Sequence, residues 1–206
     1  MNHTEPGNQP PQDTGRYLDT RNALPQRPQR VLVCGVTGVG KTTLAGRLGR
    51  LWDLPHTELD ALHHGPEWTV RPTFAQDVAR LAATERWITE WQYHSKGQGP
   101  VLGHRADTLI WLDFPRWIAL GRLVRRTLRR RLRRERLWNG NVEPPLHVFF
   151  TDPEESILRF EMLTHDKWRE RMPRLLREYP HLQVIRLTSP REARRWLAGP
   201  ANQLNG

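Results

Sequence analysis

A phosphate-binding pattern lies near the start of the chain, where the segment GVTGVGKT runs from Gly35 to Thr42. It matches GxxxxGK[ST] in full, with Gly35, Gly40, Lys41 and Thr42 in the defining positions. Glycines let the backbone turn so that successive N–H groups point at phosphate oxygens, and the N-terminus of a following helix adds a partial positive charge. The pattern predicts a nucleoside triphosphate site, with ATP and Mg²⁺ as the expected ligands.

The residue types of this loop suggest separate roles. We expect Lys41 to contact the β and γ phosphates and the Thr42 hydroxyl to ligate the Mg²⁺ that bridges them. Thr43 would support the α-phosphate. The predicted nucleotide-binding residues are Gly35, Val36, Thr37, Gly38, Val39, Gly40, Lys41, Thr42 and Thr43. Kinases, GTPases, motor ATPases and nucleotide sensors share such a loop, so it predicts binding but not a reaction.

The loop requires a strand before it and a helix after it, and the sequence offers both. VLVC at 31–34 is an apolar, β-branched run typical of a central strand. Leucines at spacings of four and three predict an amphipathic helix over 42–52. Further strands are predicted at 56–59, 86–89, 108–112 and 183–187, and further helices at 115–137, 153–179 and 190–199. This alternation predicts an α/β fold with a mainly parallel, five-stranded sheet.

Length and composition restrict the class of protein. The 206 residues suit one domain. A formal net charge of +10 favours anionic partners, such as nucleotides, phosphorylated small molecules or nucleic acid. The single cysteine, Cys34, excludes an intrachain disulfide or a multi-cysteine metal site. No apolar leader or membrane-spanning run is present, so we expect a cytoplasmic protein without a membrane partner.

Composition also divides the chain. Residues 1–28 are rich in Pro, Gln, Asn, Gly and Thr and have few large apolar side chains, which predicts a disordered tail. Residues 29–200 are predicted to form one domain, and 201–206 a second short disordered tail.

The short loop, the modest length and the arginine-rich segment after the fourth strand resemble the adenylate kinase-like P-loop kinases, and the GTPase motif NKxD is absent. The chain also resembles the DNA topology modulation protein family over most of residues 30–197. That likeness lies in LDALHH (59–64), EW (67–68), WITEWQY (87–93), ADTLIWLDFPR (106–116) and LWNGNVEPP (137–145). The resemblance implies a three-layer P-loop sandwich with strand order 2-3-1-4-5 and an arginine-rich lid at about 122–150.

The same resemblance suggests roles for two acidic residues. The strand order places the end of the third strand beside the loop, which implies that Glu90 lies near Mg²⁺; the alternative is an exposed glutamate at a strand end. This chain reads TEWQY where many relatives have an Asp-Gly pair, which leaves the role of Glu90 open. Asp60, expected at the end of the second strand, is a candidate for acceptor orientation or general base, or else a helix N-cap. Asp113 is interpreted as a helix cap rather than a metal ligand.

The arginine-rich segment supplies candidates for phosphate contacts. Arg122 and Arg126 lie four residues apart on one predicted helical face and resemble the start of the lid in adenylate kinases, where arginines clamp phosphates. Most other arginines of this segment are expected to solvate the helix. WNGNVE is either a closing flap, with Asn141 and Glu143 as contacts, or a plain interhelical loop.

Histidines and tryptophans give weaker signals. His63, His64 and His165 lack a second cluster with zinc-ligand spacing, so no zinc site is predicted. Trp68 is the better candidate for an aromatic acceptor pocket, whereas Trp87 and Trp111 are expected in the core.

The favoured function is a phosphotransferase that moves the γ-phosphate of ATP to a small hydroxyl or phosphate acceptor, and the resemblance favours the nucleoside or nucleotide class. The alternatives are a nucleotide-dependent regulator that binds nucleic acid and, ranked lower, a 5′ polynucleotide kinase. The predicted catalytic residues are Lys41, Asp60, Glu90, Arg122 and Arg126, with Thr42 and Glu90 at the metal. The acceptor and the oligomeric state stay open.

Overall fold

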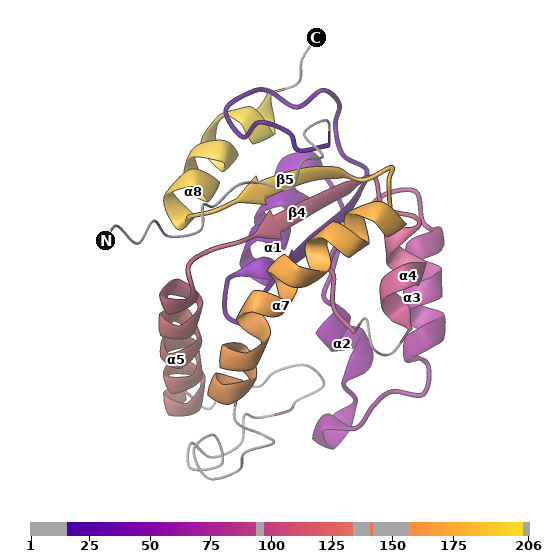
Figure 1. The fold of residues 1–206 in the computed structure, drawn as a ribbon. Coiled ribbons are helices and arrows are strands. Elements are labelled where there is room, and N and C mark those ends of the chain that lie inside the picture. The colour runs from indigo at the N-terminus through magenta and orange to yellow at the C-terminus, as the bar shows by residue number, and fades with distance from the viewer. Residues whose placement is uncertain (1–15, 94–96, 134–140, 142–156, 204–206) are drawn as a thin grey trace, which may run out of the picture.

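A computed structural model describes residues 16–93, 97–133, 141 and 157–203. Its centre is a parallel sheet with helices on both faces (Figure 1). The strands are β1 (Arg30–Gly35), β2 (His56–Thr57), β3 (Trp87–Glu90), β4 (Thr108–Leu112) and β5 (Gln183–Leu187). They lie in the order β2-β3-β1-β4-β5, and every pairing is parallel. The predicted α/β fold, the five parallel strands and their order are confirmed.

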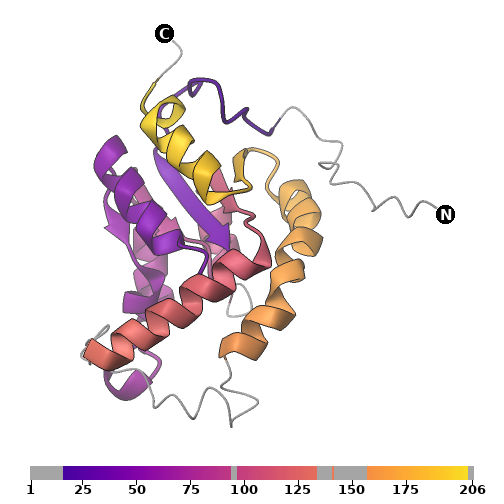
Figure 2. The ribbon, with the colours of Figure 1, turned by 90° about the vertical axis from the view of Figure 1, so that its left-hand side faces the viewer.

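The helices form two layers around the sheet. They are α1 (Lys41–Trp52), α2 (Leu59–His63), α3 (Phe74–Ala83), α4 (Gln98–Gly103), α5 (Arg116–Arg133), α7 (Ile157–Glu178) and α8 (Pro190–Ala198), with single 3₁₀ turns η1 (Pro66–Trp68) and η4 (Pro200–Asn202). Figure 2 shows α5 crossing beyond the end of β1. No helix in the described parts of the chain is long and apolar enough to cross a membrane.

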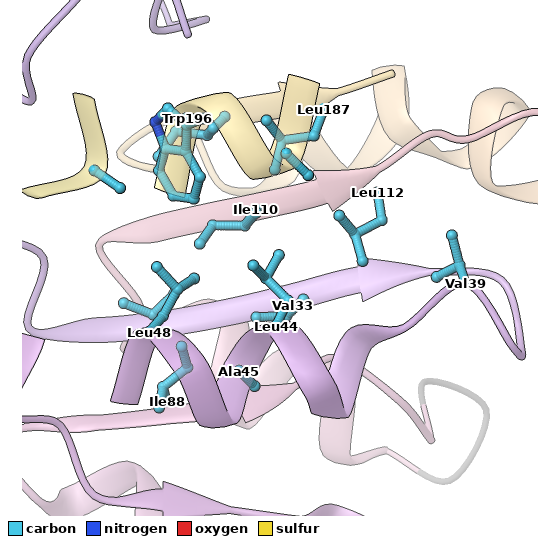
Figure 3. Close-up of a cluster of buried hydrophobic side chains, with 14 of the residues drawn as sticks. Val33, Val39, Leu44, Ala45, Leu48, Ile88, Ile110, Leu112, Leu187 and Trp196 are labelled. Carbon is cyan, nitrogen blue, oxygen red and sulfur yellow. The ribbon is translucent and has the colours of Figure 1, made fainter. Parts of the chain in front are cut away.

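Alternate residues of β1 face opposite layers, as the pleat of a strand requires. Val31 and Val33 pack with α1 and α8, in a cluster that contains Leu48 and Trp196 (Figure 3). Leu32 and Cys34 pack on the other face with α3, α4 and α7. Trp87 and Trp111 are buried in that second cluster, so their expected core positions are confirmed. The sheet is thus covered on both sides, which explains why its central strand is apolar throughout.

The register brings the carboxyl ends of three strands together. Val33 of β1 lies opposite Glu90 of β3, and Gly35 lies opposite Leu112 of β4. The segment between Gly35 and Lys41 therefore leaves the sheet beside the last residue of β3. This is the edge at which α/β proteins bind ligands.

The inner parts of both predicted tails belong to the fold. The Leu18 N–H donates to the Val184 carbonyl, and Leu24 is buried. At the other end, the carbonyl of buried Ala201 accepts a hydrogen bond of 2.7 Å from Trp52 Nε1. The structure thus differs from the composition-based tails over 16–28 and 201–203, because single apolar anchors fix segments whose average composition is polar.

The predicted lid is described only in its first part. Its residues up to Arg133 continue α5 as regular helix. Apart from Asn141, the remainder of 122–150, including Glu143, lies outside the described residues. The same holds for the side chain of His165.

Candidate functional site

The loop between β1 and α1 has the geometry that its glycines predict. Gly40 has a φ of +106° and precedes the first residue of α1 as its N-cap. No side chain caps this helix and no acidic residue lies in its first turn. The first N–H groups of α1 are therefore left for an anionic ligand, and the helix dipole favours negative charge there.

Lys41 contacts the loop carbonyl of Val36 and is affected by two carboxylates. Its Nζ donates a hydrogen bond of 3.1 Å to the Val36 carbonyl. Burial lowers the pKa of Lys41, while the negative charges of Asp60 and Glu90 act in the opposite direction. The ammonium therefore lies within electrostatic reach of both predicted acidic residues, although they come from different elements.

Glu90 is buried, with only 1% of its surface exposed, so the alternative of an exposed glutamate is wrong. His56 Nε2 lies 3.3 Å from its Oε1. Its Oε2 is buried and has no hydrogen-bond partner in the described structure. Burial opposes ionisation of Glu90, but hydrogen bonds from His56 and Thr42 outweigh it and lower its pKa.

The Glu90 carboxylate is therefore charged and lies near the Thr42 side chain, and its Oε2 has no hydrogen-bond partner within the described residues. Mg²⁺ in nucleotide sites is held by one or two protein oxygens together with phosphates and water. Thr42 and Glu90 fit this set. In the described residues no group of three His, Cys, Asp or Glu side chains forms a metal cage, so a cation here would depend on the phosphates for its other ligands.

Asp60 does not end a strand, contrary to the prediction. β2 stops at Thr57, and Asp60 lies in the first turn of α2, whose N-cap is Glu58. The alternative role of N-cap is therefore also wrong. The Asp60 Oδ1 accepts a hydrogen bond of 2.6 Å from the Tyr93 hydroxyl. Asp60 nevertheless lies close enough to Lys41 to affect its pKa.

The two predicted arginines of α5 both act on the loop. The Arg122 guanidinium donates to the Val39 carbonyl and lies 5.4 Å from the centre of the Phe114 ring. Burial lowers the pKa of Arg122, and the charge of Arg194 adds to this effect. Arg126 is near enough for its charge to lower the pKa of Lys41. Arg122 of α5 thus contacts the phosphate loop, and Arg126 lies within electrostatic reach of Lys41.

The sheet order, the glycine-rich loop and the helix after it match the arrangement that the sequence predicts. The chain has the α/β fold of P-loop proteins. No family model matches the sequence, and no match among curated proteins was found. The resemblance to the DNA topology modulation protein family therefore stays a prediction.

Several solved structures are similar to this chain at a low level. A gluconokinase from Sinorhizobium meliloti 1021 is 18% identical, with 85% of this chain and 95% of that chain covered and a TM-score of 0.47. A shikimate kinase from Acinetobacter baumannii in complex with shikimate is 18% identical, with coverage of 82% and 89% and a TM-score of 0.48. A sugar kinase from Janibacter sp. HTCC2649 is 21% identical, with coverage of 86% and 99% and a TM-score of 0.45. Likeness at this level is no evidence about the substrate of this chain.

Asp113 has a different role from the predicted helix cap. Its carboxylate accepts hydrogen bonds from Arg169 Nε at 2.8 Å and from Arg186 Nε at 3.0 Å. These ion pairs join the end of β4 to α7 and β5. The carboxylate is thus paired with two arginines, and it stabilises the packing of these elements.

The predicted pocket and flap residues contact each other. Trp68 is 36% exposed, and its ring meets the His64 ring edge-on at 5.2 Å. Its backbone N–H donates to Asn141 Oδ1 at 3.1 Å, and Asn141 Nδ2 donates to the Gly65 carbonyl at 2.8 Å. Asn141 is therefore brought to the segment that carries Trp68, on the same side of the fold as α2.

Sequence reasoning missed two residues that contact the predicted acidic groups. Tyr93 bonds Asp60, and His56 bonds Glu90. For His56 the signal is the strand register: it lies opposite Ile88, two residues before Glu90, and alternate residues of a strand share a face. For Tyr93 the only signal in the sequence is that it lies three residues after Glu90. Its contact with Asp60 depends on where α2 begins, which the sequence did not predict.

Proposed function

We propose that this protein is an ATP- and Mg²⁺-dependent phosphotransferase that acts on a small-molecule acceptor. One observation carries the proposal: Lys41 of the phosphate loop lies within electrostatic reach of two carboxylates, a buried one from β3 and a second from α2. A site that only binds nucleotide has no need of the second carboxylate. Phosphoryl transfer requires both a metal ligand and a group that orients the attacking hydroxyl.

The loop residues 35–43 would hold the triphosphate through backbone N–H groups. Thr42 and Glu90 would hold Mg²⁺. The buried Oε2 of Glu90, which has no hydrogen-bond partner in the described residues, supports this role because it is available as a metal ligand. When bound, MgATP supplies the phosphoryl group and neutralises part of its charge. Lys41 would leave the Val36 carbonyl and bind phosphate oxygens.

The remaining residues serve the acceptor and the transferring group. Asp60 would accept a hydrogen bond from the attacking hydroxyl and take its proton as the new oxygen–phosphorus bond forms and the bond from the γ-phosphorus to the departing ADP oxygen breaks. Arg122 and Arg126 would donate to phosphate oxygens, where planar guanidinium groups fit well. Catalysis would rest on positioning and charge neutralisation.

The acceptor class is a small hydroxyl or phosphate compound, and the sequence resemblance favours a nucleoside or nucleotide. No observation among the described residues favours the nucleic-acid-binding regulator. Arg122 and Arg126 interact with the loop itself, so part of the basic charge already has a role in phosphate binding.

The test is ATP consumption with Mg²⁺ against a panel of nucleosides, nucleoside monophosphates, small hydroxyl metabolites and single-stranded DNA. Lys41→Ala should abolish ATP binding or turnover while the protein stays folded by circular dichroism. Arg50→Ala is the matched control, because Arg50 is an exposed cation in the last turn of the same helix. Undiminished turnover in Lys41→Ala would refute the loop assignment. ATP binding without acceptor-dependent turnover, but altered by DNA, would favour the regulator.

A further inference from the structure

Tyr93 has an unusual backbone conformation close to the candidate site. It follows the end of β3 by three residues and has a φ of +58°. This left-handed conformation is uncommon for a residue with a bulky side chain. Such a conformation persists only where the surrounding structure fixes it, and it occurs often at functional sites. The contacts of the side chain show what fixes it here.

The ring of Tyr93 is held between two helices. The His63 ring of α2 stacks on it, with centroids 4.2 Å apart and planes 16° apart. The Phe74 ring of α3 meets it nearly edge-on at 5.2 Å. His63 and Phe74 are themselves buried. Packing therefore leaves the ring one position and directs the hydroxyl to one place.

That place is the carboxylate of Asp60. The Tyr93 hydroxyl donates to Asp60 Oδ1 at 2.6 Å and lies 3.3 Å from His64 Nε2. Burial, with the negative charge of Asp60, raises the pKa of Tyr93 far above its ordinary value. The phenol therefore stays protonated and remains a hydrogen-bond donor.

The hydrogen bond uses only one oxygen of Asp60. In the described part of the chain, no hydrogen bond reaches the other oxygen, Oδ2. Asp60 lies on the first turn of α2, and its charge acts on Lys41. A hydrogen bond to Oδ1 restricts the rotation of the Asp60 carboxylate.

We propose that Tyr93 is a positioning residue: its hydroxyl holds Asp60 through Oδ1, so that Oδ2 is presented to the acceptor hydroxyl. This inference rests on the proposed function, because it assigns Asp60 to the acceptor. Tyr93 itself does not touch the reacting atoms. It replaces the rotational freedom of a short acidic side chain with one fixed direction, which is what a general base requires.

The test removes the hydroxyl and keeps the ring. Tyr93→Phe should lower kcat with the acceptor by about tenfold to hundredfold, as expected for a misplaced catalytic group, while the Kd for ATP and the urea midpoint change little. Tyr179→Phe is the matched control, because the Tyr179 hydroxyl also donates to a carboxylate, that of Glu178, at 2.6 Å. It should leave kcat at the wild-type value.

A double substitution separates positioning from general structural support. If Tyr93 acts through Asp60, Tyr93→Phe should cause no further loss of kcat in an Asp60→Asn background. A further loss of the same factor would show that Tyr93 acts independently and would overturn the proposal. If the wild-type protein turns over and Tyr93→Phe has the same kcat, the role of Tyr93 is overturned but the proposed function is not. No acceptor-dependent turnover in the wild-type protein would overturn the proposed function and, with it, this role.

Discussion

Gly38 offers a sharp test of how α5 lies on the phosphate loop. It occupies a variable position of the loop pattern, so the pattern itself does not require glycine there. Its φ is +79°. A Cβ at this position would lie 2.8 Å from the Ala119 carbonyl oxygen and 2.9 Å from Leu123 Cβ. Both atoms belong to α5 and cannot move without the helix, so Gly38→Ala must displace either the helix or the loop.

The expected loss of stability has two parts. Holding alanine in the left-handed region costs about 1–2 kcal/mol. Overpacking a close contact costs about 1–3 kcal/mol more. Gly97→Ala is the matched control, because Gly97 has a φ of +77° but no atom within 4 Å of the added Cβ. It should therefore show only the first part, and the difference between the two variants measures the contact with α5.

The free energy of unfolding in urea and the affinity for ATP are the two measurements. Gly38→Ala should lose about 2–5 kcal/mol and Gly97→Ala about 1–2 kcal/mol, and only Gly38→Ala should weaken ATP binding. If both variants lose the same free energy, α5 does not contact the loop as described, and the proposed action of Arg122 on the phosphates loses its basis.

Three further outcomes follow from the same contacts. Replacing Arg122 and Arg126 together with alanine should lower kcat by at least about tenfold, and more than it weakens ATP binding, if their contacts form mainly in the transition state; equal losses in kcat and ATP affinity would contradict this. Asp113→Asn should lower the unfolding free energy by about 2–3 kcal/mol, less than for a fully buried pair because Arg169 is half exposed; an unchanged urea midpoint would refute the pairing. The pKa of Glu90 is lowered from its ordinary value of 4.5, so its ionised form stabilises the fold at pH values above 4.5. This stability is lost as the pH falls from 4.5 through the lowered pKa. Melting temperatures from pH 7 to pH 3 should therefore fall less for Glu90→Gln than for the wild-type protein, and parallel curves would count against the shift.

The parts of the fold that the sequence predicted are those set by local patterns. The apolar run at 31–34 and the complete loop pattern each depend on neighbouring residues alone, and the sheet order followed from a resemblance. Glu90 was placed beside the loop for the same reason. Its burial and its bond to His56 depend on the pairing of β2 with β3, which no local pattern encodes.

The placement of Asp60 shows where local reasoning fails. Residues 56–59 are predicted to form a strand, but only His56 and Thr57 pair with β3. Leu59 is instead fully buried at the start of α2, in the cluster beneath α3. Burial of this one side chain overrides the strand pattern, and the helix that begins there rotates Asp60 toward Tyr93.

The charges around the loop suggest why an anionic ligand would bind without breaking ion pairs. Three cations, Lys41, Arg122 and Arg126, oppose two carboxylates, so positive charge remains in excess beside the N-terminus of α1. Lys41 and Arg122 donate to the neutral loop carbonyls of Val36 and Val39. In these hydrogen bonds only the donor is charged, whereas in a bond to phosphate both partners are charged, so the attraction between opposite charges is added. Exchange of loop carbonyls for phosphate oxygens is therefore favourable, and it leaves Glu90 and Asp60 where the metal and the acceptor need them.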